Sequence, residues 1–251
     1  MKSINDIKTE LKDTPFDNLE LFINEYSSDG RSGVKVLVKK ANKQINDYKI
    51  ELERIEKLSF FENKYSDYEF ICGVDEVGRG PLAGPVVAGA VILPKDCDIL
   101  YINDSKKLSA KKREELYKEI TNKAVAWSTA LCTPEEIDAL NILQATYNAM
   151  KMAIHKLNPQ PNLLLNDAVK IPDIDIKQVP IIRGDSSSIS IGAASIVAKV
   201  TRDAMMVEYD NIYPGYDFAS NKGYGSAKHI EAIKKLGPTP IHRKTFIKNF
   251  I

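Results

Sequence analysis

The segment "GVDEVGRGPLAGPV", residues 73–86, constrains the fold more than any other part of the chain. It is entered from "YEFIC" and followed by "VVAGAVIL", and both runs are rich in residues that favour strands. The glycines and prolines between them predict a reversal of the chain. We expect the first strand to end at the neighbouring acids Asp75 and Glu76, because alternation along a continuing strand would send their side chains to opposite faces.

The same glycines raise the alternative of a phosphate-binding loop. Gly78, Gly80 and Ala83 match G-x-G-x-x-A, and Asp98 follows about twenty residues later. That fingerprint works only where a helix N-terminus follows the glycines and holds the pyrophosphate. Here the following run is strand-like, and two acids precede the glycines, so we reject dinucleotide binding. A Walker A loop is excluded because no G-K-[ST] follows a glycine-rich turn.

The hydrophobic pattern divides the chain into two parts. Residues 1–68 predict a small helical N-terminal extension, with amphipathic helices at 3–13 and 33–58. Residues 69–251 predict a larger domain in which strands come first and then alternate with helices, which is typical of an α/β fold with a mixed sheet. The expected strands are 68–76, 85–94, 124–132, 162–167 and 179–185, and the expected helices are 109–124, 133–157, 190–213 and 226–237.

Composition limits the compartment. The three cysteines are widely spaced and form no CxxC, which excludes a disulfide framework and a typical zinc site. No apolar stretch approaches the ~20 residues that span a bilayer, and the first residues lack the apolar run of a signal peptide. We therefore expect a cytoplasmic protein that does not contact a membrane.

Charge is informative only locally, because the formal net charge of the 251 residues is +1. Residues 31–43 hold five basic residues and no acid, and residues 219–251 hold seven basic residues and one acid. Such stretches favour a polyanionic partner such as nucleic acid. The alternative is that each is an ordinary solvated helix face.

Two further acids, Asp167 and Asp185, also follow apolar runs, as Asp75 and Glu76 do. Parallel neighbouring strands bring such ends to one edge of a sheet. Four carboxylates gathered there repel one another unless cations neutralise them, and an all-oxygen ligand set suits Mg²⁺ or Mn²⁺. Two such ions form a known arrangement for cutting phosphodiesters. A single acid at a strand end is more often a cap or a solvated turn, so the prediction depends on all four.

Six ordered motifs resemble bacterial ribonuclease HII over residues 71–246. They are "GVDEVGRGPLAGPVVAGAVIL", "DSKKL", "NDA", "GDSSSISIGAASIVAKVTRD", "GYGSAKH" and "HRKTF". The resemblance implies a ribonuclease H fold, a mixed five-stranded sheet flanked by helices. It also implies an enzyme that hydrolyses the RNA strand of RNA–DNA hybrids and nicks duplex DNA 5′ of single embedded ribonucleotides, leaving a 3′-hydroxyl and a 5′-phosphate. It implies nothing for the extension, which many members lack.

The resemblance also assigns site residues. It implies that two Mn²⁺ or Mg²⁺ ions are bound by a catalytic quartet, Asp75, Glu76, Asp167 and Asp185. The backbone of Gly78, Arg79 and Gly80 is expected to contact the ribose 2′-hydroxyl, because glycine permits close approach. Tyr224 is expected to stack on the following deoxyribose. Phosphate contacts are expected from Ser105, Lys106, Lys107, Lys199 and Arg202.

Several alternatives stay open at this stage. Another nuclease of the same fold, such as a resolvase or an exonuclease, uses similar carboxylates, and a non-catalytic hybrid-binding protein is a third reading. Asp203 either pairs with Lys199 four residues earlier or supports the site from behind. His229 and His242 are expected to contact phosphate or to make structural hydrogen bonds. We expect a monomer.

Overall fold

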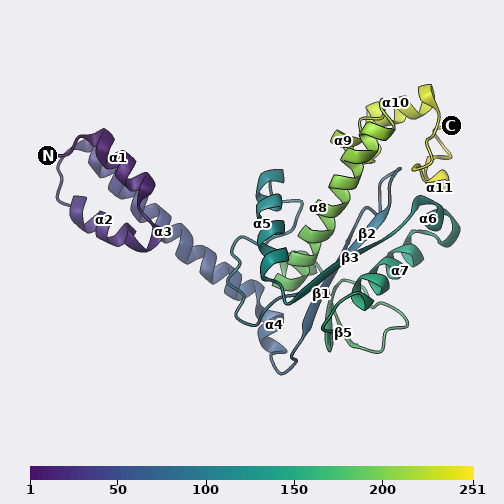
Figure 1. The fold of residues 1–251 in the computed structure, drawn as a ribbon, viewed down its shortest axis with the longest axis horizontal. Coiled ribbons are helices and arrows are strands. Elements are labelled where there is room, and N and C mark those ends of the chain that lie inside the picture. Colours follow the sequence, from purple (N-terminus) through teal and green to yellow (C-terminus); the bar gives the residue numbers. More distant parts are fainter. The chain divides into compact units, whose positions relative to one another are not determined.

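The computed structural model describes all residues, 1–251, and the chain divides into two compact units, Met1–Glu56 and Lys57–Ile251. The first unit contains α1 (Ile4–Asp13), a short 3-10 turn (Phe16–Asn18), α2 (Leu19–Tyr26) and most of α3 (Ser32–Leu58) (Figure 1). Ser3 begins α1 with a capping box to Asp6. The sequence analysis did not predict α2, although its buried residues recur at three- and four-residue spacing.

The second unit is built on one sheet of five strands in the order β3-β2-β1-β4-β5. The pairs β1–β2 and β2–β3 are antiparallel, whereas β1–β4 and β4–β5 are parallel. The mixed five-stranded sheet predicted from the sequence is therefore confirmed. The strands are β1 (Ile71–Val77), β2 (Val86–Ile92), β3 (Ala126–Cys132), β4 (Leu163–Asp167) and β5 (Lys177–Ile181).

Helices cover both faces of this sheet (Figure 1). The helices of this unit are α4 (Phe60–Lys64), α5 (Ala110–Lys123), α6 (Pro134–Leu140), α7 (Ile142–His155), α8 (Ile189–Ile212), α9 (Phe218–Asn221), α10 (Ala227–Leu236) and α11 (Lys244–Ile247), with a 3-10 turn at Gly184–Ser186. Those that pack directly on the sheet are α7 and α8. None of the helices combines the length and the apolar character needed to cross a bilayer. The boundary predicted between residues 68 and 69 lies further along the chain than the division between the two units, because α4 belongs to the second unit.

Close packing of α8 on the sheet sets the position of the acidic strand ends. A Cβ added to Gly73 in β1 would lie 2.0 Å from the carbonyl carbon of Ser190, and one added to Gly89 in β2 would lie 2.4 Å from the carbonyl oxygen of Ala194. Glycine at both positions therefore lets the helix backbone rest directly on the strands. On the other face, α7 packs against β2 and β3 around an apolar core that includes Val74 and Met150.

The single helix predicted over residues 133–157 is wrong, because two helices occupy this stretch. Thr133 begins α6, at the predicted start, with a capping box to Glu136. The chain then breaks at Asn141, which has a φ of 73° and accepts hydrogen bonds from the N–H groups of Leu143 and Gln144. Asparagine adopts a positive φ more readily than most residues and is a strong N-cap, so it ends one helix and starts the next.

Candidate active site

Three of the four predicted acids lie near the ends of neighbouring parallel strands. Val74 pairs with Asn166 in the register of β1 and β4, so Asp75 and Asp167 lie level with each other, one residue further on. Asp185 lies in the turn Gly184–Ser186 that follows β5, the strand next to β4. The three residues therefore lie along the edge of the sheet where its parallel strands end.

The expected end of the first strand is corrected by the structure. Strand β1 continues to Val77, and the register pairs Asp75 with Gly89 and Glu76 with Ala88. The two acids therefore leave the strand toward opposite faces. Asp75 is buried on the α8 side, where Ser195 hydrogen-bonds its carboxylate.

Electrostatic coupling nevertheless links all four carboxyl groups. Burial is the main cause that raises the pKa of Asp75 well above its usual range, and the negative charges of Glu76 and Asp167 add to it. Burial raises the pKa of Glu76, with a further contribution from Asp167 and an opposing one from Arg79. Burial and the charges of Asp104 and Asp167 raise the pKa of Asp185. The site thus disfavours several ionised carboxylates at once, which is the condition that a bound cation relieves.

The ligand set fits a hard divalent cation in chemistry, although the side chains form no ready coordination shell. No group of three His, Cys, Asp or Glu residues is close enough together to hold an ion as they stand. Protein donors hold the carboxylates instead: Gly184 N–H donates to Asp167 Oδ1 at 2.6 Å, and Arg79 donates to Glu76 Oε1 at 3.2 Å. The second oxygen of Glu76 is buried without any partner, which suits a metal ligand.

Asp104 was not singled out as a site residue, although it follows the apolar run "ILYIN" and begins the motif "DSKKL". It lies in the turn before "SKKL" and accepts a hydrogen bond from the N–H of Lys106. Burial opposes protonation of Lys106, yet the charges of Asp104, Asp75 and Asp185 together raise its pKa above the ordinary value. Lys106 is therefore an exposed cation beside the acidic centre, and Lys107 is exposed next to it. Both stay candidates for phosphate contact.

The other expected phosphate contacts have different environments. Ser105 is buried, and its hydroxyl shares a hydrogen bond of 3.0 Å with Ser195, the residue that holds Asp75. Lys199 is mostly buried and donates to Asp203 at 2.7 Å, so Asp203 is the helical partner of Lys199. The Ser105 hydroxyl and one donor of the Lys199 ammonium are therefore already engaged by protein partners.

Arg202 does not fit the phosphate contact expected of it. The side chain is fully buried, and its guanidinium donates to the carbonyl oxygens of Pro85, Ala83 and Lys222 at 2.9, 3.1 and 2.9 Å. Arg202 therefore supports the loop after β1 from within the protein. The local sequence "VTRD" does not indicate that Arg202 is buried, because the loop that covers its side chain is distant in the chain.

The two sides of the expected ribose-reading site lie next to each other. Gly80 is exposed, and a Cβ added to it would meet only Cε1 of Tyr224, at 3.9 Å. Tyr224 is 44% exposed, so it is partly accessible to a ligand. Gly78 differs from Gly80: it has a φ of 91°, and a Cβ there would lie 2.2 Å from Nε of Arg202.

Glu62 is another residue that the sequence analysis did not single out. It lies in α4, and its carboxylate accepts hydrogen bonds from the hydroxyl of Ser188, the N–H of Ser190 and the hydroxyl of Ser190. A negatively charged carboxylate at the first turn of α8 interacts favourably with the positive end of the helix dipole. Glu62 thereby holds the helix start that follows Asp185.

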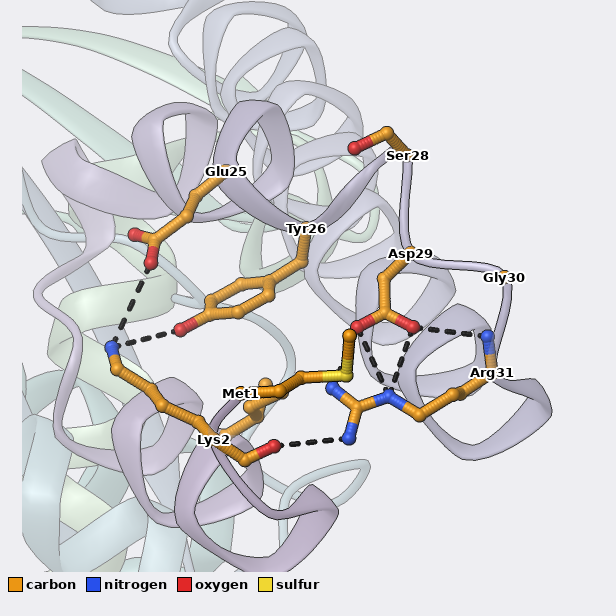
Figure 2. Close-up of a pocket in the computed structure, with 9 residues that line it drawn as sticks. Met1, Lys2, Glu25, Tyr26, Ser28, Asp29, Gly30 and Arg31 are labelled. Carbon is orange, nitrogen blue, oxygen red and sulfur yellow. Dashed lines mark hydrogen bonds and ion pairs between the residues drawn. The ribbon is translucent and has the colours of Figure 1, made fainter.

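A separate hollow in the first unit carries none of the predicted site residues (Figure 2). Its cations are already paired: Arg31 forms a fork with Asp29, and Lys2 contacts Glu10 and Tyr26. Its charges therefore serve the packing of the helical unit.

Comparison with solved structures defines the class of protein. Ribonuclease H2 from Pyrococcus horikoshii OT3 aligns with a TM-score of 0.59 at 26% identity, covering 72% of this chain and 96% of that chain. A Bst ribonuclease HIII in complex with Mn²⁺ aligns with a TM-score of 0.55 at 16% identity, covering 70% and 67%. The fold and its acidic edge thus define a ribonuclease H-like protein.

Sequence comparison is more specific. The model of the family "Ribonuclease HII" matches residues 72–249, and that of the "Ribonuclease HII N-terminal domain" matches residues 3–66. Ribonuclease HII of Lachnoclostridium phytofermentans is 62% identical over 226 residues, 90% of this chain and 89% of the relative, and that of Clostridioides difficile is 50% identical over 252 residues, 100% and 99%. The chain belongs to the ribonuclease HII family, and it is a hydrolase that acts on RNA–DNA hybrids.

Proposed function

We propose that the protein cuts a duplex 5′ of a ribonucleotide, including a single ribonucleotide embedded in DNA, and leaves a 3′-hydroxyl and a 5′-phosphate. One observation carries this proposal: the exposed Gly80 and the half-exposed ring of Tyr224 lie side by side at the end of β1, which also bears the acids. A sugar seated there meets a backbone that can sense a 2′-hydroxyl and a ring that can stack on its neighbour.

The acidic quartet is proposed to do the hydrolysis. Asp75, Glu76, Asp167 and Asp185 would hold two divalent ions, Mn²⁺ or Mg²⁺. When bound, such ions supply an activated water and stabilise the charge on the leaving 3′ oxygen. The buried orphan oxygen of Glu76 and the raised pKa of Asp75 support this assignment.

Ribose recognition is proposed to come from main chain on one side and from an aromatic ring on the other. Gly78 supplies the left-handed turn, while Arg79 and Gly80 are exposed at its tip. The 2′-hydroxyl is what separates RNA from DNA at a given position, and backbone groups read it without depending on the base. Lys106 and Lys107 would add phosphate contacts of the sequence-independent kind.

The test replaces one carboxylate while keeping its shape. Asp75→Asn should abolish cutting of an end-labelled duplex with one ribonucleotide, because the buried ligand loses its charge. The variant should keep its fold, and Mn²⁺ should raise the melting temperature of the parent but not that of the variant. A cleaving Asp75→Asn protein would contradict the proposed role, and equal cutting of an all-DNA duplex by the parent would favour a resolvase or an exonuclease instead.

A further inference from the structure

The segment next to α11 carries two consecutive buried polar residues, His242 and Arg243, that the catalytic proposal does not use. The chain here runs beside the loop that follows β1: Arg243 N–H donates to the carbonyl of Leu82 at 2.9 Å, and Gly84 N–H donates to the carbonyl of Ile241 at 2.8 Å. Asp138 in α6 fixes the start of α11, accepting from the backbone N–H groups of residues 244 and 245. Hydrogen bonds to the loop after β1 and to α6 therefore hold in place the segment that carries His242 and Arg243.

Arg243 grips the glycine turn from inside the protein. Its guanidinium donates to the carbonyl oxygens of Gly78 at 2.5 Å, Arg79 at 2.8 Å and Gly84 at 2.8 and 3.0 Å. The side chain is fully buried, and no carboxylate lies within ion-pair distance of it. Burial, together with the neighbouring charge of Arg202, lowers its pKa to about 9. A buried cation needs compensation, and here it comes from the carbonyl dipoles, from the Phe246 ring 5.1 Å away and from the charge of Asp138. The hydrogen bonds direct the carbonyls of the turn toward the guanidinium.

The direction of the carbonyl groups decides the direction of the N–H groups. In a trans peptide the C=O and the following N–H point to opposite sides. Because the carbonyls of Gly78 and Arg79 point at Arg243, the N–H groups of Arg79 and Gly80 point away from it. Neither N–H has an acceptor in the protein. By holding the two carbonyls, Arg243 thus orients the N–H groups of Arg79 and Gly80 as free donors at the exposed tip of the turn.

His242 holds the other side of the same site through His229. The Nε2 atoms of the two rings are 3.0 Å apart, and His229 Nδ1 lies 2.8 Å from the carbonyl oxygen of Tyr224. His242 Nδ1 accepts from the N–H of Thr239 at 2.9 Å, which fixes its proton on Nε2. His242 then donates to His229, and His229 donates to Tyr224. Every ring nitrogen is satisfied in the neutral pair.

We propose that His242 and Arg243 are positioning residues that set the two halves of the ribose-reading site against each other, Arg243 through the peptide groups of Gly78 and Arg79, and His242 through the backbone of Tyr224. This inference rests on the proposed recognition of an embedded ribonucleotide. It assigns to the C-terminal segment a role in discriminating RNA from DNA.

The main experiment measures discrimination instead of activity. In an Asp75→Asn background, which binds without cutting, the Kd is measured for a duplex with one ribonucleotide and for the same duplex in DNA alone. Arg243→Lys keeps the charge but cannot reach three carbonyls at once, so the preference for the ribonucleotide duplex should fall about tenfold, the size of one to two lost hydrogen bonds. A residue needed only for folding leaves this ratio unchanged, because the folded fraction affects both duplexes alike.

A matched control is Lys248→Ala, which removes an exposed cation from the same segment. It should weaken binding to both duplexes equally. If the parent prefers the ribonucleotide duplex and Arg243→Lys keeps that preference within twofold, this inference is overturned while the proposed function stands. If the parent shows no preference, the proposed ribonucleotide recognition itself fails.

A second variant covers the case in which Arg243→Lys does not fold. His242→Gln in the active enzyme removes the ring that orients His229. Its kcat/KM should fall several-fold more on a single embedded ribonucleotide than on a long RNA–DNA hybrid, since Tyr224 faces deoxyribose only in the former. Equal losses on the two substrates would refute the role of His242.

Discussion

The two outer glycines of "GRG" provide a sharp test, because the structure assigns them different physical demands. At Gly80 an added Cβ meets one atom of Tyr224 at 3.9 Å, an ordinary contact, and the rest of its surroundings is open space. At Gly78 an added Cβ would lie 2.2 Å from Arg202 Nε and 2.8 Å from the carbonyl oxygen of Pro85, at a φ of 91°. We therefore expect Gly80→Ala to damage substrate recognition and Gly78→Ala to damage the fold.

The magnitudes follow from these contacts. Gly80→Ala changes an exposed position, so its free energy of unfolding should stay within about 0.5 kcal/mol of the parent. The new methyl group occupies the space beside Tyr224 where the sugar is proposed to lie, and a displacement of ~1 Å there can cost about 100-fold in kcat/KM. Gly78→Ala adds backbone strain of about 1–3 kcal/mol, before the clash with Arg202 is counted. At the upper end this lowers the melting temperature by roughly 6–12 °C.

Two measurements separate the variants. Thermal unfolding followed by circular dichroism reports the fold, and cleavage of an end-labelled duplex with one ribonucleotide reports kcat/KM. The reasoning would be refuted by a Gly80→Ala protein that melts as early as Gly78→Ala. A Gly80→Ala protein with the kcat/KM of the parent would equally show that no sugar approaches this residue.

Two further results are expected. Tyr224→Ala should lower cutting at single ribonucleotides more than cutting of a long hybrid while leaving Mn²⁺ binding by calorimetry unchanged, and equal small losses on both substrates would contradict stacking. The second result concerns pH. Burial, followed in size by the charge of His229, lowers the pKa of His242 from 6.5 to about 4. The neutral His242 ring therefore contributes its full stabilisation above pH 6.5, and this stabilisation is lost as the pH falls toward 4. The difference in unfolding free energy between the parent and His242→Gln should therefore shrink by up to ~3 kcal/mol between pH 7 and pH 4 in denaturant titrations, and a constant difference would disprove a neutral buried ring.

Much of the fold was accessible from local signals. The expected helix starts at residues 109 and 133 and the expected end at 237 agree with the structure, where Ser109 and Thr133 are N-caps and Gly237 is a C-cap. The break at Asn141 was missed because apolar periodicity continues across it, and no glycine or proline marks the positive φ of 73° at that residue.

The acidic edge was predicted with a partly wrong reason. Parallel pairing of β1 with β4 does bring Asp75 level with Asp167, but β1 runs on through Glu76 instead of ending there. Alternation along one strand is visible in a sequence, whereas the residue at which pairing with a neighbour stops depends on that neighbour.

The sequence by itself determined which chemical groups this protein owns: four acids after apolar runs, a turn that needs glycine, and an aromatic ring in a basic segment. Only the tertiary structure decided which cations face a ligand. Lys106 is exposed beside the acids, whereas Arg202 and Arg243 are buried and donate hydrogen bonds to carbonyls, mainly those of the loop after β1. The physical reason is that burial is a property of segments far apart in the chain, here residues 78–85 and the C-terminal segment, and a charge carries no local sign of what will cover it.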